Sequence, residues 1–431
     1  MIIGYNVVMV VAILLLWPIW VPVVGFRKKH RRTFLKRLFM EALPRNDTAS
    51  GDAGGPVWIH ALSVGEVLSA EPLVKALAQK IGGHRLVFTA STQTGYEMAT
   101  RVMAPHVAAI RHFPYDTPFS VRRALTVVGP RLVVIVETDI WPNFLYSLNR
   151  CKIPVHLVNA RLSDGSFRGY KRIGFLMSPL LSLFERICVQ TDSDRFRFLE
   201  LGVSEKKLAT VGNIKFDQAP VSVSAEDLNR LSEGLCLSES APVWVAGSTH
   251  QGEEAVLSDA YRSLRATGID AVLIVVPRDP GRAIAVCSIF RRSGVDARTM
   301  GQIERQPSPS AVVVIDRIGV LRQLYALADV AFVGGSLVDA GGHNPLEPAS
   351  VAKPILFGPH TSDFRWICQT LENEGGAIRV DDAHQLAGQA GHLMVNRDAN
   401  RRVGQRARDV FIKNRGAVER TLAVIGSDIH P

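Results

Sequence analysis

Short apolar runs alternate with longer stretches of helical spacing along most of the chain. After residue 56, runs rich in valine and isoleucine predict strands at residues 57–61, 85–90, 131–137, 155–158 and 186–190. The pattern then restarts, with further strands predicted at residues 243–247, 271–276, 311–315, 330–333 and 354–357. Strands that are apolar at every position are typical of parallel sheets with helices on both faces. The pattern therefore predicts an α/β protein with two doubly wound, Rossmann-like domains.

A polar stretch at residues 217–239 indicates where the two domains separate. We expect a first domain at residues 57–216, a second at 217–405, and a C-terminal helix at 406–431 that can pack back on the first domain. Doubly wound folds bind their ligands at the carboxyl ends of the strands. Two such domains facing each other therefore predict a central cleft.

The N-terminal residues form a long uncharged segment. No charged residue occurs between Ile2 and Phe26, and a segment of about 20 to 25 apolar residues can cross a bilayer. Pro18 and Pro22 would kink or end a helix early. Shallow insertion into one leaflet and burial as a hydrophobic helix are therefore alternatives. We expect residues 1–26 to form a membrane anchor.

Charge and cysteine usage favour a cytoplasmic protein at a membrane. The net charge is +10, and seven lysines and arginines lie within the first 40 residues, which contain no acidic residue. The remaining chain carries 43 basic and 40 acidic residues, so the sequence favours anionic membrane lipids over nucleic acid as a partner. We expect residues 27–56 to be a basic interfacial segment and linker on the cytoplasmic side. The five scattered cysteines are typical of reduced thiols.

Polar residues with catalytic potential follow strands of the first domain. Glu66 lies in the first turn of the helix after residues 57–61, where free backbone N–H groups can bind an anion. A carboxylate at this place can equally serve only to complement the helix dipole. Glu137 ends the run at residues 131–137, and it can be catalytic or cap the following helix. Lys215, near the expected domain crossing, can meet a phosphate group or remain solvated.

The second domain has glycine-rich turns that suit a nucleotide. Arg278 follows Pro277 at the end of a predicted strand, where it can pair with a phosphate or a base edge. Residues 334–335 and 341–342 are glycine pairs that permit a tight turn against a ligand. Glu347 then opens a helix and can accept hydrogen bonds from ribose hydroxyls. The sequence contains no metal-binding motif and no P-loop, and the second absence argues against a kinase or ATPase.

Taken together, these motifs resemble the Kdo transferases of lipopolysaccharide synthesis. The matching segments occur in family order between about residues 55 and 370, and they are WIHALSVGE (58–66), VETDIWPN (136–143), VNARLSDGSFRGY (158–170), GNIKFD (212–217), GSTHQGEE (247–254) and FVGGSLVDAGGHNPLEPA (332–349). The resemblance implies a two-domain glycosyltransferase fold. It also implies transfer of 3-deoxy-D-manno-oct-2-ulosonic acid (Kdo) from CMP-Kdo to the lipid A precursor lipid IVA, without a cofactor or a catalytic metal, at the cytoplasmic face of the bacterial inner membrane.

The resemblance also assigns roles to particular residues. Glu66 matches the catalytic base, and Glu137 and Lys215 match residues that assist the transition state. The CMP-binding positions of the family correspond to Pro277, Arg278, Ile318, Gly319, Val320, Asn344, Pro345, Leu346 and Glu347.

This chain departs from the family pattern at two of the matched motifs. Family members commonly have an acidic residue where this chain has Val320, so only a backbone contact would survive there. Asp139 replaces a more usual glutamate, which places it outside the expected core site. Candidates to receive the Kdo carboxylate are Arg161, Arg168 and Lys171.

Two alternative functions fit the same fold. A nucleotide-sugar epimerase or hydrolase could use these domains, because the fold alone does not determine the reaction. A non-catalytic membrane scaffold that retains nucleotide binding is the other alternative. The apolar N-terminus and the loop that ends at Glu66 favour transfer to a lipid acceptor.

Overall fold

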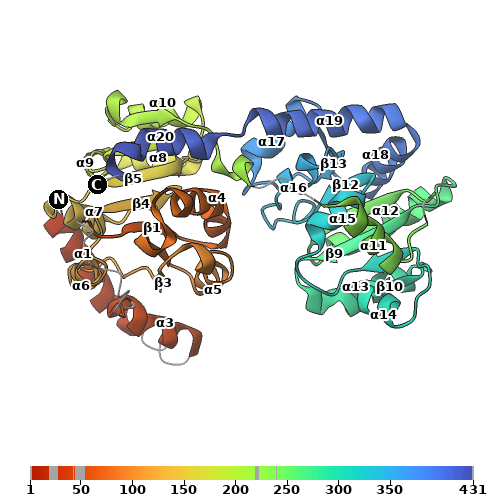
Figure 1. Cartoon of the computed structure of the whole chain (residues 1–431), viewed down its shortest axis with the longest axis horizontal. Coiled ribbons are helices and arrows are strands. Elements are labelled where there is room, and N and C mark those ends of the chain that lie inside the picture. The colour runs from red at the N-terminus through yellow and green to blue at the C-terminus, as the bar shows by residue number, and fades with distance from the viewer. Residues whose placement is uncertain are drawn as a thin grey trace. The chain divides into compact units, whose positions relative to one another are not determined.

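The computed structural model describes residues 2–18, 28–41, 43, 54–218, 223–238 and 240–429. The chain forms two compact units. The N-terminal unit comprises residues up to Gln218 together with those from Arg415 onward, and the C-terminal unit comprises residues 219–414. Figure 1 shows the blue C-terminal helix α20 (Ala417–Ile429) lying with the red to yellow elements of the N-terminal unit.

The N-terminal unit is built on a seven-stranded parallel sheet. Its order is β3 (Ala109–His112), β2 (Leu86–Ala90), β1 (Val57–Ala61), β4 (Leu132–Val136), β5 (Val155–Ala160), β6 (Arg186–Val189) and β7 (Leu208–Thr210). The strand order reverses between β1 and β4, which is where doubly wound folds bind ligands. Its further helices include α4 (Val64–Ile81), α5 (Gln93–Val102), α6 (Pro118–Val128), α7 (Pro142–Arg150), α8 (Asp164–Arg172), α9 (Gly174–Leu181) and α10 (Asp192–Glu200).

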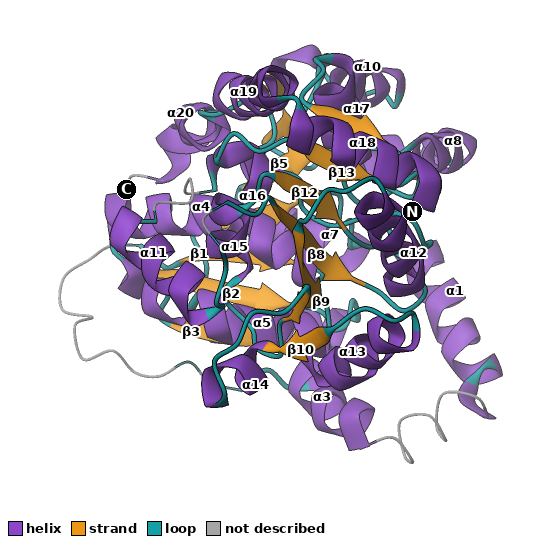
Figure 2. Ribbon diagram, turned by 90° about the vertical axis from the view of Figure 1, so that its right-hand side faces the viewer, coloured by secondary structure: helices purple, strands orange, loops and turns teal. Residues whose placement is uncertain are grey.

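The C-terminal unit repeats this architecture with a second seven-stranded parallel sheet. Its order is β10 (Ala297–Thr299), β11 (Val312–Val314), β9 (Val272–Pro277), β8 (Val243–Thr249), β12 (Val330–Val333), β13 (Ile355–Phe357) and β14 (Ala377–Arg379). Its helices include α11 (Ala225–Gly234), α12 (Glu253–Ala266), α13 (Ala283–Arg292), α14 (Met300–Arg305), α15 (Leu321–Leu327), α16 (Leu346–Ser350), α17 (Arg365–Asn373), α18 (Ala383–Val395) and α19 (Arg397–Lys413). In both units the strands lie between helices (Figure 2). The prediction of two parallel α/β domains is therefore confirmed, whereas the cleft between them stays a prediction.

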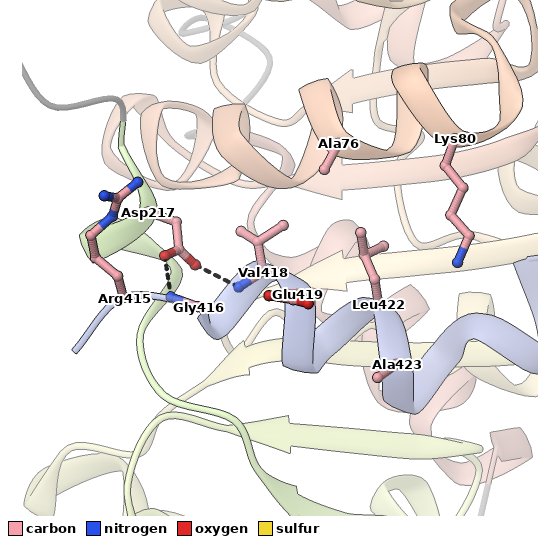
Figure 3. A pocket seen from close by; sticks show the side chains of 9 residues that line it. All are labelled: Ala76, Lys80, Asp217, Arg415, Gly416, Val418, Glu419, Leu422 and Ala423. Carbon is pink, nitrogen blue, oxygen red and sulfur yellow. Dashed lines mark hydrogen bonds between the residues drawn. The ribbon is translucent and has the colours of Figure 1, made fainter. Parts of the chain in front are cut away.

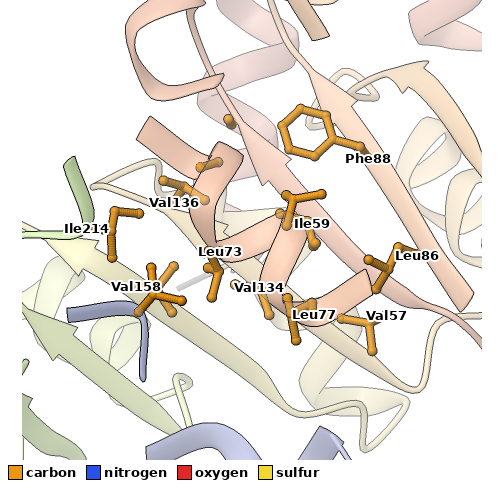
Figure 4. Close-up of a cluster of buried hydrophobic side chains, with 14 of the residues drawn as sticks. Val57, Ile59, Leu73, Leu77, Leu86, Phe88, Val134, Val136, Val158 and Ile214 are labelled. Carbon is orange, nitrogen blue, oxygen red and sulfur yellow. The ribbon is translucent and has the colours of Figure 1, made fainter. Parts of the chain in front are cut away.

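Alternate residues of β1 enter separate cores on the two faces of the first sheet. Val57 and Ile59 pack in the cluster that contains Leu73 of α4 (Figure 4), whereas Trp58 packs on the other face against Phe144. Burial of one such side chain contributes about 1.5 to 3 kcal/mol. Because the sheet is covered on both faces, its central strands are apolar at almost every position.

The domain boundaries differ slightly from those expected. The N-terminal unit extends to Gln218 rather than residue 216, and helix α19 continues through residue 405 to Lys413 because Ala407 and Phe411 on it are buried. The C-terminal segment therefore begins at Arg415, not at residue 406.

Helix α20 is joined to the N-terminal unit by hydrogen bonds at both ends. The carboxylate of Asp217 accepts hydrogen bonds of 2.6 Å from the backbone N–H groups of Gly416 and Val418 at its start. At its end, the Arg131 guanidinium donates one of 2.6 Å to the carbonyl of Ile429.

Within the residues that the structure describes before the first sheet, the chain forms the helices α1 (Ile2–Leu15) and α3 (Lys28–Leu38). The hydroxyl of Tyr5 donates to Asp116, and the amide of Asn143 donates to Asn6, so α1 rests on the N-terminal unit. None of the helices described here is both long and apolar enough to cross a membrane. The anchor expected at residues 1–26 is therefore unsupported, and residues 19–26 lie outside the described part of the chain.

Candidate functional site

Glu66 lies at the point where the strand order of the first sheet reverses. It occupies the first turn of α4, directly after β1. Its Oε2 atom accepts a hydrogen bond of 2.5 Å from the backbone N–H of Leu62, so the side chain folds back over the turn. The N-cap residue Ser63 makes no side-chain capping bond. The carboxylate of Glu66 thus holds the turn that follows the carboxyl end of β1.

The carboxyl group of Glu66 titrates far from its ordinary range. Burial and then the negative charge of Glu137 raise its pKa from 4.5 to about 8, and the charge of Asp139 adds to the increase. Hydrogen bonds from the backbone of Leu62 and Ser63 oppose the shift. The structure therefore gathers three acidic side chains, and it gives one of them a pKa suited to a general base near neutral pH.

The raised pKa of Glu66 predicts that this residue lowers stability as the pH rises. Between its ordinary pKa of 4.5 and about 8, the unfolded chain releases the proton while the folded chain retains it, so the free energy of unfolding falls across this window. Glu66→Gln keeps the neutral form. We expect its stability relative to the wild type to increase by roughly 3 to 4 kcal/mol between about pH 5 and pH 8. Urea unfolding measures this difference, and a difference independent of pH would contradict the expectation.

Glu137 and Lys215 meet beside this turn. Glu137 follows β4 with a backbone φ of 62°, a left-handed conformation that costs a non-glycine residue on the order of 1 kcal/mol or more. Its Oε1 atom lies 3.4 Å from Nζ of Lys215, which belongs to the 3₁₀ turn Ile214–Asp217 after β7. Both side chains are almost completely buried. Glu66, Glu137 and Lys215, the three first-domain residues of the expected site, therefore gather at the carboxyl ends of the strands.

The three cations expected to be candidates for binding the Kdo carboxylate do not lie together in the structure. Nε of Arg161 lies 3.5 Å from Oε2 of Glu137, so Arg161 joins the group around Glu137 and Lys215. Lys171 instead forms an exposed ion pair with Glu200, and Arg168 is exposed. Of the three, only Arg161 has a contact in the described structure with the gathered residues.

A buried histidine–aspartate pair, which the sequence did not predict, lies near Glu66. Nε2 of His60 on β1 lies 2.8 Å from Oδ2 of Asp139, and its Nδ1 lies 3.0 Å from the hydroxyl of Thr89. The ring stacks on Phe113. Asp139, which was expected outside the core site, therefore lies beside it. The sequence signal was a histidine within a strand that is otherwise apolar and buried on both faces.

In the C-terminal unit, the strand order reverses between β8 and β12. The side chain of Glu253 holds the loops at this position together. This carboxylate is 0% exposed and accepts four backbone N–H hydrogen bonds, from His250, Gly335, Ser336 and Leu337. Gly335 has φ of 69°, which favours glycine. The sequence predicted no role for Glu253 itself, although Glu253 lies in the motif GSTHQGEE that resembles the family.

Of the residues matched to CMP binding, Arg278 and the start of α16 lie near Glu347. Burial raises the pKa of this carboxyl, while the charges of Arg322 and Arg278 oppose the increase. Nε of Arg322 lies 3.6 Å from Oε1 of Glu347, and Arg322 lies two residues after Val320. Asn344 accepts a hydrogen bond from the backbone N–H of Leu346 at the start of α16. Arg278, the first turn of α15 and the start of α16 thus share one neighbourhood.

Two histidines complete this neighbourhood. Nε2 of His250 lies 2.8 Å from Nε2 of His343, so one ring must donate to the other. Burial and then the charge of Arg278 lower the pKa of His343 to about 4, which keeps it neutral at physiological pH. His343 therefore offers an uncharged polar ring beside the arginine.

A cavity of about 570 Å³ lies elsewhere, between α4 and α20 (Figure 3). It is lined by Ala76, Lys80, Asp217, Arg415, Gly416, Val418, Glu419, Leu422 and Ala423. None of these is a residue of the sites described above, so cavity volume does not identify the functional residues. Within the described ranges, no group of three His, Cys, Asp or Glu side chains is arranged to hold a metal ion.

Comparison with solved structures supports the fold. A glycosyltransferase from Rickettsia africae aligns with a TM-score of 0.56 at 12% identity, covering 88% of this chain and 100% of that protein. At this identity the likeness concerns the fold alone.

Comparison of sequences identifies the family. Residues 28–218 match the family described as 3-deoxy-D-manno-octulosonic-acid transferase (kdotransferase). The 3-deoxy-D-manno-octulosonic acid transferase of Haemophilus influenzae is 34% identical over 86% of this chain and 86% of that protein. The corresponding transferase of Bordetella pertussis is 30% identical over 87% of each. The chain therefore belongs to the 3-deoxy-D-manno-octulosonic acid transferase family.

Proposed function

We propose that this protein is an inverting glycosyltransferase that moves Kdo from CMP-Kdo to the lipid A precursor lipid IVA. The observation that supports this most strongly is the surroundings of Glu66, where burial and two neighbouring carboxylates raise its pKa to about 8. A base of this strength suits removal of a proton from an acceptor hydroxyl. We assign the acceptor to the N-terminal unit and CMP to the C-terminal unit.

In this mechanism Glu66 takes the hydroxyl proton as the acceptor oxygen bonds to the anomeric carbon of Kdo. The bond to the CMP oxygen breaks on the opposite side, which inverts the configuration at that carbon. The positive charge of Lys215 stabilises negative charge that develops in the transition state, and Glu137 holds the lysine within 3.4 Å. Proton transfer to a positioned base contributes about 10²- to 10⁴-fold to the rate.

The C-terminal unit supplies contacts for the nucleotide. The carboxylate of Glu347 can accept hydrogen bonds from the ribose hydroxyls, while Arg278 offers positive charge to the phosphate. Arg322 lies close to Glu347 and adds a second cation. With these side chains supplying positive charge, we propose that transfer needs neither a metal ion nor a cofactor.

Mass spectrometry of the reaction products tests this function. The purified protein is incubated with CMP-Kdo and tetra-acylated lipid IVA in detergent, and both the lipid and the released sugar are measured. We expect a lipid product heavier by at least one Kdo. Free Kdo without glycolipid would indicate a hydrolase, an isomerised donor would indicate an epimerase, and an unchanged mixture would support a non-catalytic scaffold.

We also propose that the protein acts at the cytoplasmic face of the bacterial inner membrane. Helix α1 exposes large apolar side chains along its length, with Leu14 and Leu15 at 65% and 73% exposure. Leu35, Phe39 and Phe119 are exposed as well, and the two phenylalanine rings contact each other edge to face. Exposed apolar groups beside a basic segment favour shallow insertion into an anionic bilayer.

Removing apolar side chains from α1 should weaken membrane binding. Changing both Leu14 and Leu15 to serine removes two side chains whose burial contributes about 1.5 to 3 kcal/mol each, so we expect at least about a tenfold loss of affinity. Flotation with vesicles that contain anionic phospholipid measures it. Ile284→Ser, at a site 72% exposed in the C-terminal unit, is the matched control. Equal binding by the α1 variant and the control would contradict this role.

A further inference from the structure

Two strained residues stand side by side at the ends of neighbouring strands. Val136 of β4 pairs with Val158 of β5, so the residues that follow them, Glu137 and Asn159, occupy matching positions. Their φ angles are 62° and 56°, a region that non-glycine residues seldom adopt. Left-handed residues of this kind occur mainly where the surrounding structure holds them for a function. Glu137 belongs to the proposed site, whereas Asn159 has no role in the mechanism above.

Asn159 belongs to a closed network of buried side-chain amides. The Gln190 amide donates to the backbone carbonyl of Asn159 over 2.9 Å, and the Asn213 amide donates to Oε1 of Gln190 over 3.0 Å. In return, Oδ1 of Asn159 accepts from the backbone N–H of Ile214 over 3.1 Å. All three amide side chains are buried. The network therefore links the ends of β5 and β6 to the turn after β7.

This network holds the backbone at Lys215. Oδ1 of Asn213 accepts a hydrogen bond of 3.0 Å from the Lys215 backbone N–H. The backbone N–H of the preceding residue, Ile214, donates to Oδ1 of Asn159. The backbone N–H groups of Ile214 and Lys215 are thus both fixed, at the point from which the lysine side chain extends to Glu137. The arrangement also leaves Nδ2 of Asn159 without a partner among the described residues. A buried unpaired donor and a left-handed asparagine both lower stability, which argues against a role in stability alone.

We propose that Asn159, Gln190 and Asn213 are positioning residues that fix Lys215 against Glu137 for Kdo transfer. The inference rests on the proposed function, because it requires that Lys215 assists the reaction. A displacement of about 1 Å at a catalytic group can lower the rate by about 10²-fold. The amides act through the lysine, so their removal should change kcat rather than the binding of CMP-Kdo.

A double-mutant cycle with Gln190→Leu and Lys215→Met tests the inference. We expect Gln190→Leu to lower kcat by about 10- to 100-fold, with less than about a threefold change in the KM for CMP-Kdo. In the Lys215→Met background, the same change should cause no further loss, because the group that the amides position is already absent. Asn159→Gly should also lower kcat, and glycine accepts the positive φ, so this variant keeps the test open if Gln190→Leu does not fold.

A second buried substitution in the same unit distinguishes a positioning role from a role in stability alone. Thr421 is 0% exposed, and its hydroxyl donates to the carbonyl of Ala417 within α20. Thr421→Val should lower the melting temperature without the loss of kcat. Unimpaired kcat in Gln190→Leu and Asn159→Gly, or an equal loss with and without Lys215, would overturn the inference and leave the proposed function intact. Unimpaired Kdo transfer by Lys215→Met would overturn the role of Lys215, and the inference with it.

Discussion

Replacing Glu66 with glutamine is expected to lower kcat for Kdo transfer by about 10²- to 10⁴-fold. Glutamine keeps the size of the side chain and a carbonyl oxygen that can still accept the N–H hydrogen bond of Leu62. It cannot remove a proton from the acceptor. Because CMP is assigned to the C-terminal unit, the KM for CMP-Kdo should change little. Steady-state kinetics with lipid IVA at saturation measure both quantities.

The matched control is Glu71→Gln on the same helix. Glu71 forms an ion pair of 2.7 Å with Lys75 one turn along α4, outside the group of carboxylates around Glu66. We expect its activity to remain close to that of the wild type, because ion pairs between residues four apart on a helix contribute only about 0.3 to 0.5 kcal/mol. An equal loss in both variants would show that the charge of the helix matters rather than the base.

Glu253→Gln is expected to destabilise the C-terminal unit by about 3 kcal/mol, because it replaces charge-assisted hydrogen bonds that are worth about 1.5 to 3 kcal/mol each. The buried carboxylate accepts from His250 and Gly335 at one oxygen and from Ser336 and Leu337 at the other. Glutamine can place an acceptor on only one side, and its NH₂ group would face two N–H donors. Since these N–H groups shape the glycine turn after β12, affinity for CMP-Kdo should fall at least about tenfold as well.

Urea unfolding and calorimetric titration of CMP-Kdo measure the two effects. Asp259→Asn provides the control, because Asp259 lies on the same helix, is 68% exposed and only reaches Arg262 at 4.0 Å. That change should alter stability by less than about 0.5 kcal/mol. Wild-type stability and donor affinity in Glu253→Gln would refute the role of this carboxylate in shaping the turn.

The sequence predicted the interior of both sheets and missed their edges. Every predicted strand is present, because central strands are buried on both faces and therefore appear as continuous apolar runs. The strands that escaped prediction are β3, β7, β10 and β14, which are the four edge strands. They are short and carry polar residues such as Arg111 and Arg298. Edge strands commonly carry charge because it prevents pairing with other chains, and this weakens their sequence signal.

The candidate site was predictable to a similar extent. The sequence indicated Glu66 and Glu137 as candidates because Glu66 opens the helix after one strongly apolar strand and Glu137 follows another. The buried partners His60 and Asp139 were not found, since their contact joins the end of β1 to the loop after β4. Glu253 escaped for the same reason, because three of its four backbone donors lie more than 80 residues away in sequence. Spacing along the chain identifies positions, whereas contacts between distant loops determine what those positions do.

The central claim is that Glu66 is the catalytic base, and the pH dependence of kcat/KM tests it most directly, because this quantity reports the pKa values of the free enzyme. In the wild type we expect kcat/KM to rise with pH through a transition centred near 8. Glu137→Gln should move the transition to lower pH, because the charge of Glu137 contributes most after burial to the raised pKa. In Glu66→Gln the transition should disappear from the remaining activity. A transition that persists unchanged in Glu66→Gln would contradict the claim and assign the titration to another group.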